Sequence, residues 1–126
     1  MVQYQSKRYQ FERGENSGGI EIKLDTRFSQ TGHLFIEVSE KTNPSNPAYV
    51  PSGIYRDDSW LYAIGDYANV FVFLTRHLRW LHAKGLCTEK ETPTARGFLL
   101  PESGARKYAA TVLSHEQSGQ MELTLF

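Results

Sequence analysis

The stretch Gly19-Ile20-Glu21-Ile22-Lys23-Leu24-Asp25 alternates apolar and ionisable side chains, and the interpretation of the whole chain depends on it. Successive side chains of an extended strand point to opposite faces, so the three apolar residues share one face and Glu21, Lys23 and Asp25 share the other. The alternation therefore predicts a strand with three ionisable groups on a single face.

This ionisable face has two interpretations. Two carboxylates flanking an ammonium group can hold a divalent metal ion, orient a water molecule and stabilise developing negative charge. The same alternation is the ordinary pattern of an amphipathic edge strand with one face on the core and one in water. The solvated face is the commoner case, and spacing alone leaves both interpretations open.

Length and composition indicate one folded domain over residues 1–126. The chain is 40% hydrophobic and 13% aromatic, which is enough apolar material for a core. Its 14 basic and 14 acidic side chains cancel, so any contact with a nucleic acid must come from a local patch rather than from the overall charge.

The cysteine content and hydropathy indicate the compartment. Cys87 is the single cysteine, which excludes an internal disulfide and a cysteine zinc site and is typical of a reducing interior. No apolar run approaches the roughly 20 residues needed to cross a bilayer, and the N-terminus has no apolar signal core. We expect a cytoplasmic protein that does not contact a membrane.

Strands are expected throughout the N-terminal half. Residues 7–13 alternate, and the turn formers of residues 14–19 are expected to join them as a hairpin to the strand that carries Glu21. Residues 33–39 carry apolar groups on both faces, as a central strand does. Residues 40–52 contain three prolines and are expected to form the longest loop.

Two further apolar runs, residues 60–64 and 70–73, predict buried strands. Their aromatic side chains are therefore expected in the core or in an interface rather than as platforms for stacked bases, which need exposed rings on a basic surface. This expectation applies to Trp60, Tyr62 and Phe71.

Two helices are expected in the C-terminal half. Thr75 is a suitable N-cap for the first helix, which ends before Gly85, and Ser103 is expected to cap a second helix that runs to Leu113. The intervening segments are expected to be a loop at residues 87–97 and a short strand at 98–100. A last edge strand is expected at residues 121–126.

These elements predict an α/β (α+β) fold with a mixed central sheet of five or six strands and two helices packed on it. The first helix carries a basic face formed by Arg76, Arg79 and Lys84. Such a face is usually solvated, but it can also lie along phosphates.

Other catalytic templates fit poorly. The glycines of residues 14–19 lie in the expected hairpin and not before a helix, so they do not form a phosphate-cradling loop. The four histidines lack the spacing of zinc ligands, and no nucleophile elbow supports a serine hydrolase. The strand carboxylates remain the best candidate site.

Several short motifs occur in order along the chain. Glu12 is followed by Glu21-Ile22-Lys23, by Asp25, by Thr31-Gly32-His33-Leu34-Phe35-Ile36-Glu37 and by Ser52-Gly53-Ile54. This combination resembles the small phage and bacterial nucleases of the PD-(D/E)XK superfamily. The resemblance implies a restriction-endonuclease-like fold and a phosphodiesterase that uses Mg²⁺ or Mn²⁺ to cleave DNA or RNA.

The resemblance also implies roles for single residues. Glu12 and Glu21 would hold the metal ion, and Lys23 would complete the catalytic set by assisting the attacking water. Asp25 would act behind the metal ligands, and Glu37 would face the same cleft from the third strand. The helix residues Arg76, Arg79 and Lys84 would contact phosphates.

Two departures from the family pattern are visible. The family usually has aspartate where Glu12 stands, and it commonly carries a glutamate on an N-terminal helix, whereas residues 1–8 contain no acidic side chain. These departures and the neutral net charge favour a second hypothesis. In it the chain is a catalytically inactive interaction protein that binds a second copy of itself or another protein, for example as a phage inhibitor of a host enzyme.

In the active form, Lys23→Ala is expected to abolish turnover and to leave the fold intact. The reason is that a lysine on a polar strand face contributes little to stability.

Overall fold

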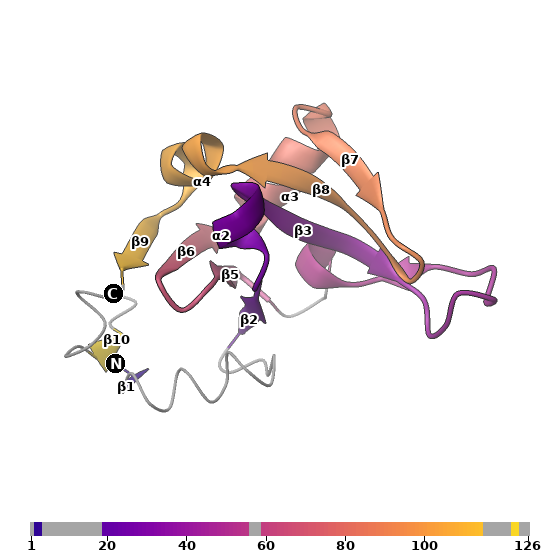
Figure 1. The fold of residues 1–126 in the computed structure, drawn as a ribbon, viewed down its shortest axis with the longest axis horizontal. Coiled ribbons are helices and arrows are strands. Elements are labelled where there is room, and N and C mark those ends of the chain that lie inside the picture. Colours follow the sequence, from indigo (N-terminus) through magenta and orange to yellow (C-terminus); the bar gives the residue numbers. More distant parts are fainter. Residues whose placement is uncertain (1, 4–18, 56–58, 115–121, 124–126) are drawn as a thin grey trace.

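The computed structural model describes residues 2–3, 19–55, 59–114 and 122–123. Within these ranges the chain forms a mixed α+β fold with two four-stranded sheets (Figure 1). A separate antiparallel pair joins β1 (Val2–Gln3) to β10 (Glu122–Leu123), close to the two ends of the chain. No helix in the described part of the chain is long and apolar enough to cross a membrane.

The first sheet has the strand order β2-β5-β6-β9. Its strands are β2 (Ile20–Leu24), β5 (Leu61–Gly65), β6 (Asn69–Leu74) and β9 (Thr111–Ser114). β2 runs parallel to β5, and the other pairs are antiparallel. Parallel neighbours need a long crossover connection, and here the crossover carries part of the second sheet.

The second sheet is antiparallel and has the order β4-β3-β8-β7. It contains β3 (His33–Glu40), β4 (Val50–Pro51), β7 (Thr88–Glu91) and β8 (Ala95–Pro101). The first two of these strands lie in the connection from β2 to β5, and the other two follow the main helix. The second sheet therefore covers one face of the first.

Three α-helices and one 3₁₀ helix complete the fold over the described residues. α2 (Phe28–Thr31) links β2 to β3, and the 3₁₀ helix η1 (Gly53–Tyr55) precedes β5. α3 (Thr75–Lys84) follows β6 directly, and α4 (Glu102–Tyr108) follows β8 directly.

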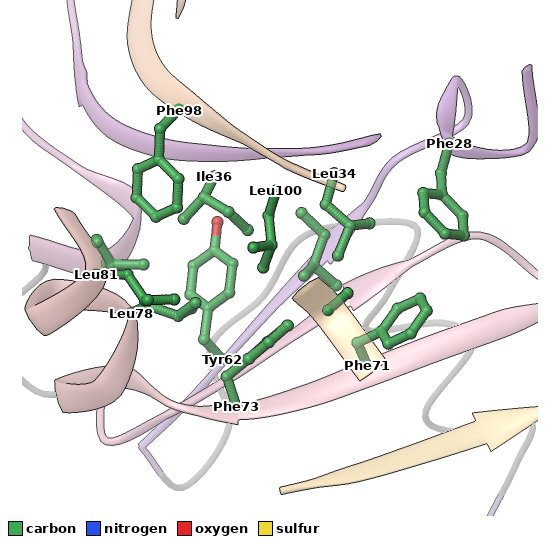
Figure 2. Packing of buried hydrophobic residues seen from close by; sticks show 13 residues of the cluster. Phe28, Leu34, Ile36, Tyr62, Phe71, Phe73, Leu78, Leu81, Phe98 and Leu100 are labelled. Carbon is green, nitrogen blue, oxygen red and sulfur yellow. The ribbon is translucent and has the colours of Figure 1, made fainter. Parts of the chain in front are cut away.

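The main core lies between the two sheets (Figure 2). β5 and β6 contribute Tyr62, Phe71 and Phe73, and β3 and β8 contribute apolar side chains from the other side. α3 closes one end of this core with Leu78 and Leu81. A second cluster on the opposite face of the first sheet includes Ile20, Ile22, Leu61, Ala63 and Val72.

Both faces of the first sheet are therefore buried, and this changes the meaning of the alternation in β2. Ile20 and Ile22 lie in the second cluster, as the pattern predicts. Glu21 pairs with Tyr62 and Lys23 pairs with Ile64, so the ionisable face of β2 belongs to the inner layer of the protein. It is not a solvated face.

Several sequence predictions are confirmed. Residues 20–24 form a strand, β3 is an inner strand of its sheet, and β5, β6 and α3 lie close to their predicted positions. Tyr62 and Phe71 are fully buried, whereas Trp60 is half-exposed. Trp60 is therefore not a core residue, because it precedes β5 and lies outside the buried strand; its alternative placement in an interface stays a prediction.

The predicted sheet of five or six strands is not confirmed, since each larger sheet has four strands in the described residues. Residues 87–97 are not a loop, because β7 and the start of β8 form a hairpin there. Every residue of β7 is exposed, so backbone pairing and not apolar burial holds this strand, and no hydrophobic pattern marked it.

The helix predicted from Ser103 to Leu113 ends at Tyr108, and β9 begins at Thr111. The β-branched pair Thr111 and Val112 favours a strand. Thr75 is not an N-cap but the first helical residue, and its hydroxyl makes no hydrogen bond. The predicted strand at 7–13, the hairpin at 14–18 and most of residues 121–126 lie outside the described residues.

We expect Gly53→Ala to lower the free energy of unfolding by more than Gly85→Ala does. Both glycines have left-handed backbones, with φ of 57° and 66°, which costs any other residue about 1–2 kcal/mol. A Cβ at Gly53 would also overlap the carbonyl oxygen of Glu37, whereas a Cβ at Gly85 meets nothing within 4 Å. Overpacking of this kind adds about 1–3 kcal/mol. Urea unfolding of both variants measures the difference, and equal losses would contradict the close approach.

Candidate functional site

A cleft of about 630 Å³ opens beside the ionisable strand. Its walls come from β2 and the segment leading to α2, from β3 and β5, and from the β7–β8 hairpin. The charged side chains along it are Lys23, Asp25, Arg27, Glu37 and Lys90. The cleft thus brings together residues that are far apart in the sequence.

Glu21 does not line this cleft, but it contacts the cleft residue Lys23. Its exposed fraction is 0%, and neither carboxylate oxygen accepts a hydrogen bond. Lys23 is its ion-pair partner, with Nζ 3.5 Å from Oε2. A carboxylate removed from water without hydrogen bonds is costly to a fold, so this residue does not contribute to stability.

Lys23 links Glu21 to the cleft, since its side chain is 30% exposed and lines the cleft wall. It is also the one cation paired with Glu21 among the described residues. Removing one partner of a buried pair leaves an uncompensated charge. We therefore revise the expectation that Lys23→Ala leaves the fold intact, and use Lys23→Arg to keep the charge.

Asp25 fixes the end of β2 against β3. Its Oδ1 accepts the backbone N–H of Arg27 at 3.1 Å, and its Oδ2 accepts the backbone N–H of Phe35 at 3.0 Å. Both oxygens are thus engaged with the backbone. The structure gives Asp25 a positioning role at the edge of the cleft.

Glu37 lines the cleft from β3, as predicted, and is held from behind. Ser52, which is fully buried, donates its hydroxyl to Glu37 Oε2 at 2.6 Å. Gly53 then passes so close to the Glu37 backbone that only a glycine fits. Ile36-Glu37 and Ser52-Gly53-Ile54 are separate in the sequence, but these contacts make them one structural unit.

Tyr62 lies between these carboxylates, and sequence reasoning assigned it only to the core. Its ring is buried, and its hydroxyl points across the core toward β3 (Figure 2). Burial raises the pKa of Tyr62 well above its usual value, and the charges of Glu37, Glu21 and Asp25 raise it further. The nearby backbone N–H of Glu37 partly offsets this rise in the pKa. The Tyr62 hydroxyl nevertheless has no hydrogen-bond partner.

The other predicted site residues are placed differently. Arg76, Arg79 and Lys84 lie on α3, and none of them lines the cleft. Arg27 and Lys90 supply cations there instead, and Lys90 was missed because its segment was predicted to be a loop. Glu12 lies outside the described residues, so its metal-binding role stays a prediction.

The oxygen-rich character of the site suits a hard divalent cation. Within the described ranges, no group of three or more His, Cys, Asp or Glu side chains is placed to hold a metal ion. Magnesium, however, is commonly held by one or two carboxylates and keeps several water molecules. The Glu21 carboxylate, which has an ion pair with Lys23 but no hydrogen bond, and Glu37, whose charge acts on the same phenol, fit that requirement.

Comparisons with protein-family models, with curated proteins and with solved structures gave no match.

Glu21→Gln is expected to raise the free energy of unfolding at pH 7 by about 1–2 kcal/mol, because it removes a buried charge that has no hydrogen bond. Lys23 is partly exposed and remains hydrated in the variant. Glu91→Gln, at an exposed residue of β7, is the control and should change stability by less than about 0.5 kcal/mol. A loss of stability in Glu21→Gln, measured by urea unfolding, would mean that the carboxylate makes favourable native contacts.

Tyr62 should also make the fold sensitive to alkali. Because the pKa of Tyr62 is raised in the folded state, its phenol ionises near pH 10 only in the unfolded chain. Its contribution to stability is thus complete below pH 10 and is lost as pH rises above it, by about 1.4 kcal/mol per pH unit. Urea unfolding from pH 9 to 11 should show a steeper decline for the wild type than for Tyr62→Phe, and parallel curves would refute this.

Proposed function

We propose that the protein is a metal-dependent nuclease, or a nuclease-like protein that processes nucleic acid, with a restriction-endonuclease-like arrangement around Glu21 and Lys23. The observation that carries the proposal is the buried Glu21 carboxylate without a hydrogen bond. Proteins commonly keep a destabilising arrangement of this kind where function needs it.

The donor set supports a divalent cation as cofactor. Glu21 and Glu37 would hold Mg²⁺ or Mn²⁺, together with Glu12 if its predicted role is correct. When bound, such an ion neutralises the carboxylates and supplies a polarised water molecule. Asp25 keeps the end of β2 fixed against β3 through its two backbone hydrogen bonds.

Lys23 is the residue best placed to act on a phosphodiester. Its ammonium group lies at the cleft wall and is held by the Glu21 carboxylate. In this position it would stabilise negative charge that develops on the phosphoryl oxygens. Arg27 and Lys90 line the same cleft and would position the phosphate backbone without reading its sequence.

The second candidate function is a catalytically inactive nuclease-fold protein that binds another protein. One observation favours it: both Asp25 oxygens are occupied by backbone groups, so Asp25 has little capacity left for a cation. In this case the cleft would bind neither metal ion nor nucleic acid, and an experiment separates the two functions.

We expect Glu21→Gln and Lys23→Arg each to lower the rate of Mg²⁺- or Mn²⁺-dependent cleavage by about 100-fold or more. The first variant removes the charge of a proposed metal ligand, and the second replaces a compact ammonium group by a larger planar guanidinium. The substrates are supercoiled plasmid and labelled single strands of DNA and RNA. Isothermal titration with Mn²⁺ provides a readout that does not depend on activity. Glu21→Gln should weaken Mn²⁺ binding, and Lys23→Arg should not.

Glu91→Gln is the matched control, since it removes one exposed carboxylate outside the cleft. Equal cleavage by the wild type and all three variants would indicate another site or a contaminant. A folded wild type that neither cleaves nor binds Mn²⁺ would rule out the nuclease and leave the interaction protein.

A further inference from the structure

One side of α3 presents an aromatic ring between cations. Arg76, Trp80 and Lys84 follow one another at a spacing of four residues, so they share one side of the helix. All three are exposed, and Trp80 is 45% exposed. We call these three residues and the adjacent His77 the α3 stripe.

The stripe points away from the core. Leu78 and Leu81, on the other side of α3, are buried between the sheets (Figure 2). Arg79 belongs to that other side as well, because its Nε donates to the carbonyl of Ile54 and its guanidinium lies over the Tyr55 ring. The predicted phosphate contacts therefore divide, with Arg76 and Lys84 on the stripe and Arg79 off it.

Neighbouring rings extend and support Trp80. The His77 ring lies 5.8 Å from the Trp80 ring, and the Tyr108 ring of α4 packs edge-on against His77 at 5.2 Å. Lys107 places its ammonium 5.2 Å from the centre of the Tyr108 ring. A row of rings with cations beside it thus runs from α3 to α4.

Among the residues that the structure describes, the charged side chains of the α3 stripe have one sign. α3 contains no acidic residue, and neither Arg76 nor Lys84 forms an ion pair in the described part of the chain. On α4 the acidic Glu102 is already paired with Arg106. The cations of the stripe are thus available to an anionic ligand, although the chain as a whole is neutral.

We propose that the α3 stripe binds single-stranded nucleic acid, with a base stacked on Trp80 and phosphates at Arg76 and Lys84. Exposed rings among cations are the usual means of binding single strands without sequence preference. A duplex hides the faces of its bases, so an indole ring can stack only on an unpaired base. A protein partner fits less well, because lysine is depleted in protein interfaces and Trp80 is the only exposed large hydrophobic residue of α3.

This proposal rests on the proposed function in one respect only: both take nucleic acid as the ligand. The stripe is separate from the cleft, since no residue of α3 lines the cleft. Binding can therefore be measured with EDTA present and with cleavage excluded. The two proposals can then fail independently.

The experiment measures the anisotropy of a labelled oligo(dT) with the full chain. Because the protein has two tryptophans, Trp60→Phe leaves Trp80 as the sole indole, and oligo(dT) should quench its fluorescence. Trp80→Ala should weaken binding by about tenfold, and Trp80→Phe should restore most of the affinity. Arg76→Gln and Lys84→Gln should each reduce the salt slope of log K by about 0.7.

Arg96→Gln, at an exposed cation on β8, is the control for lost charge and should leave the salt slope unchanged. Unchanged affinity in Trp80→Ala, or equal affinity for duplex DNA, would overturn the proposal. Competition by polyglutamate as strong as that by oligo(dT) would overturn it in favour of an acidic protein partner. If the protein does not cleave nucleic acid but binds oligo(dT) normally, the proposed nuclease activity is refuted and the proposed binding by the α3 stripe is supported.

Discussion

The parallel pairing of β2 with β5 is the constraint on which the rest of the structure depends. It places Glu21 opposite Tyr62 and turns the ionisable face of β2 toward the second sheet. Because parallel neighbours require a crossover, the chain between them is long enough to include β3 and the Ser52-Gly53-Ile54 segment. The same crossover returns Glu37 to the cleft beside Lys23. One pairing thus produces both the two-layer core and the cluster of charges at its edge.

The carboxylates of the site are held in very different ways. Asp25 receives two backbone hydrogen bonds, and Glu37 receives the hydroxyl of Ser52. Glu21 receives none and has only the ammonium of Lys23 nearby. Asp25 and Glu37 are therefore fixed by hydrogen bonds, whereas Glu21 has only its ion pair with Lys23. This difference makes Glu21 the carboxylate of the three with the fewest polar contacts.

The sequence predicts β2, β3, β5, β6 and α3 well because local alternation, apolar runs and helical spacing directly encode them. It does not predict β7, whose residues are all exposed, or the division into two sheets, which depends on pairing between distant segments. For the site, the strand pattern identifies Glu21, Lys23 and Asp25, and the comparison with the family pattern adds Glu37. Tyr62 reaches the site because of the register of β2 against β5. Lys90 reaches it because of the β7–β8 hairpin, which has no apolar pattern in the sequence. Neither is visible in local sequence.

The burial of Glu21 also separates the two candidate functions on energetic grounds. A protein that acted only through its surface would be more stable with an uncharged side chain at position 21, because replacing a buried ion pair by packed apolar groups is often neutral or favourable. Trp80, Arg76 and Lys84 could serve such a protein without any contribution from β2. A buried carboxylate beside a partly exposed lysine is the arrangement on which the proposed chemistry in the cleft rests. The inner face of β2 and the outer side of α3 are therefore separate parts of the molecule, to which we assign the proposed reaction and the proposed binding.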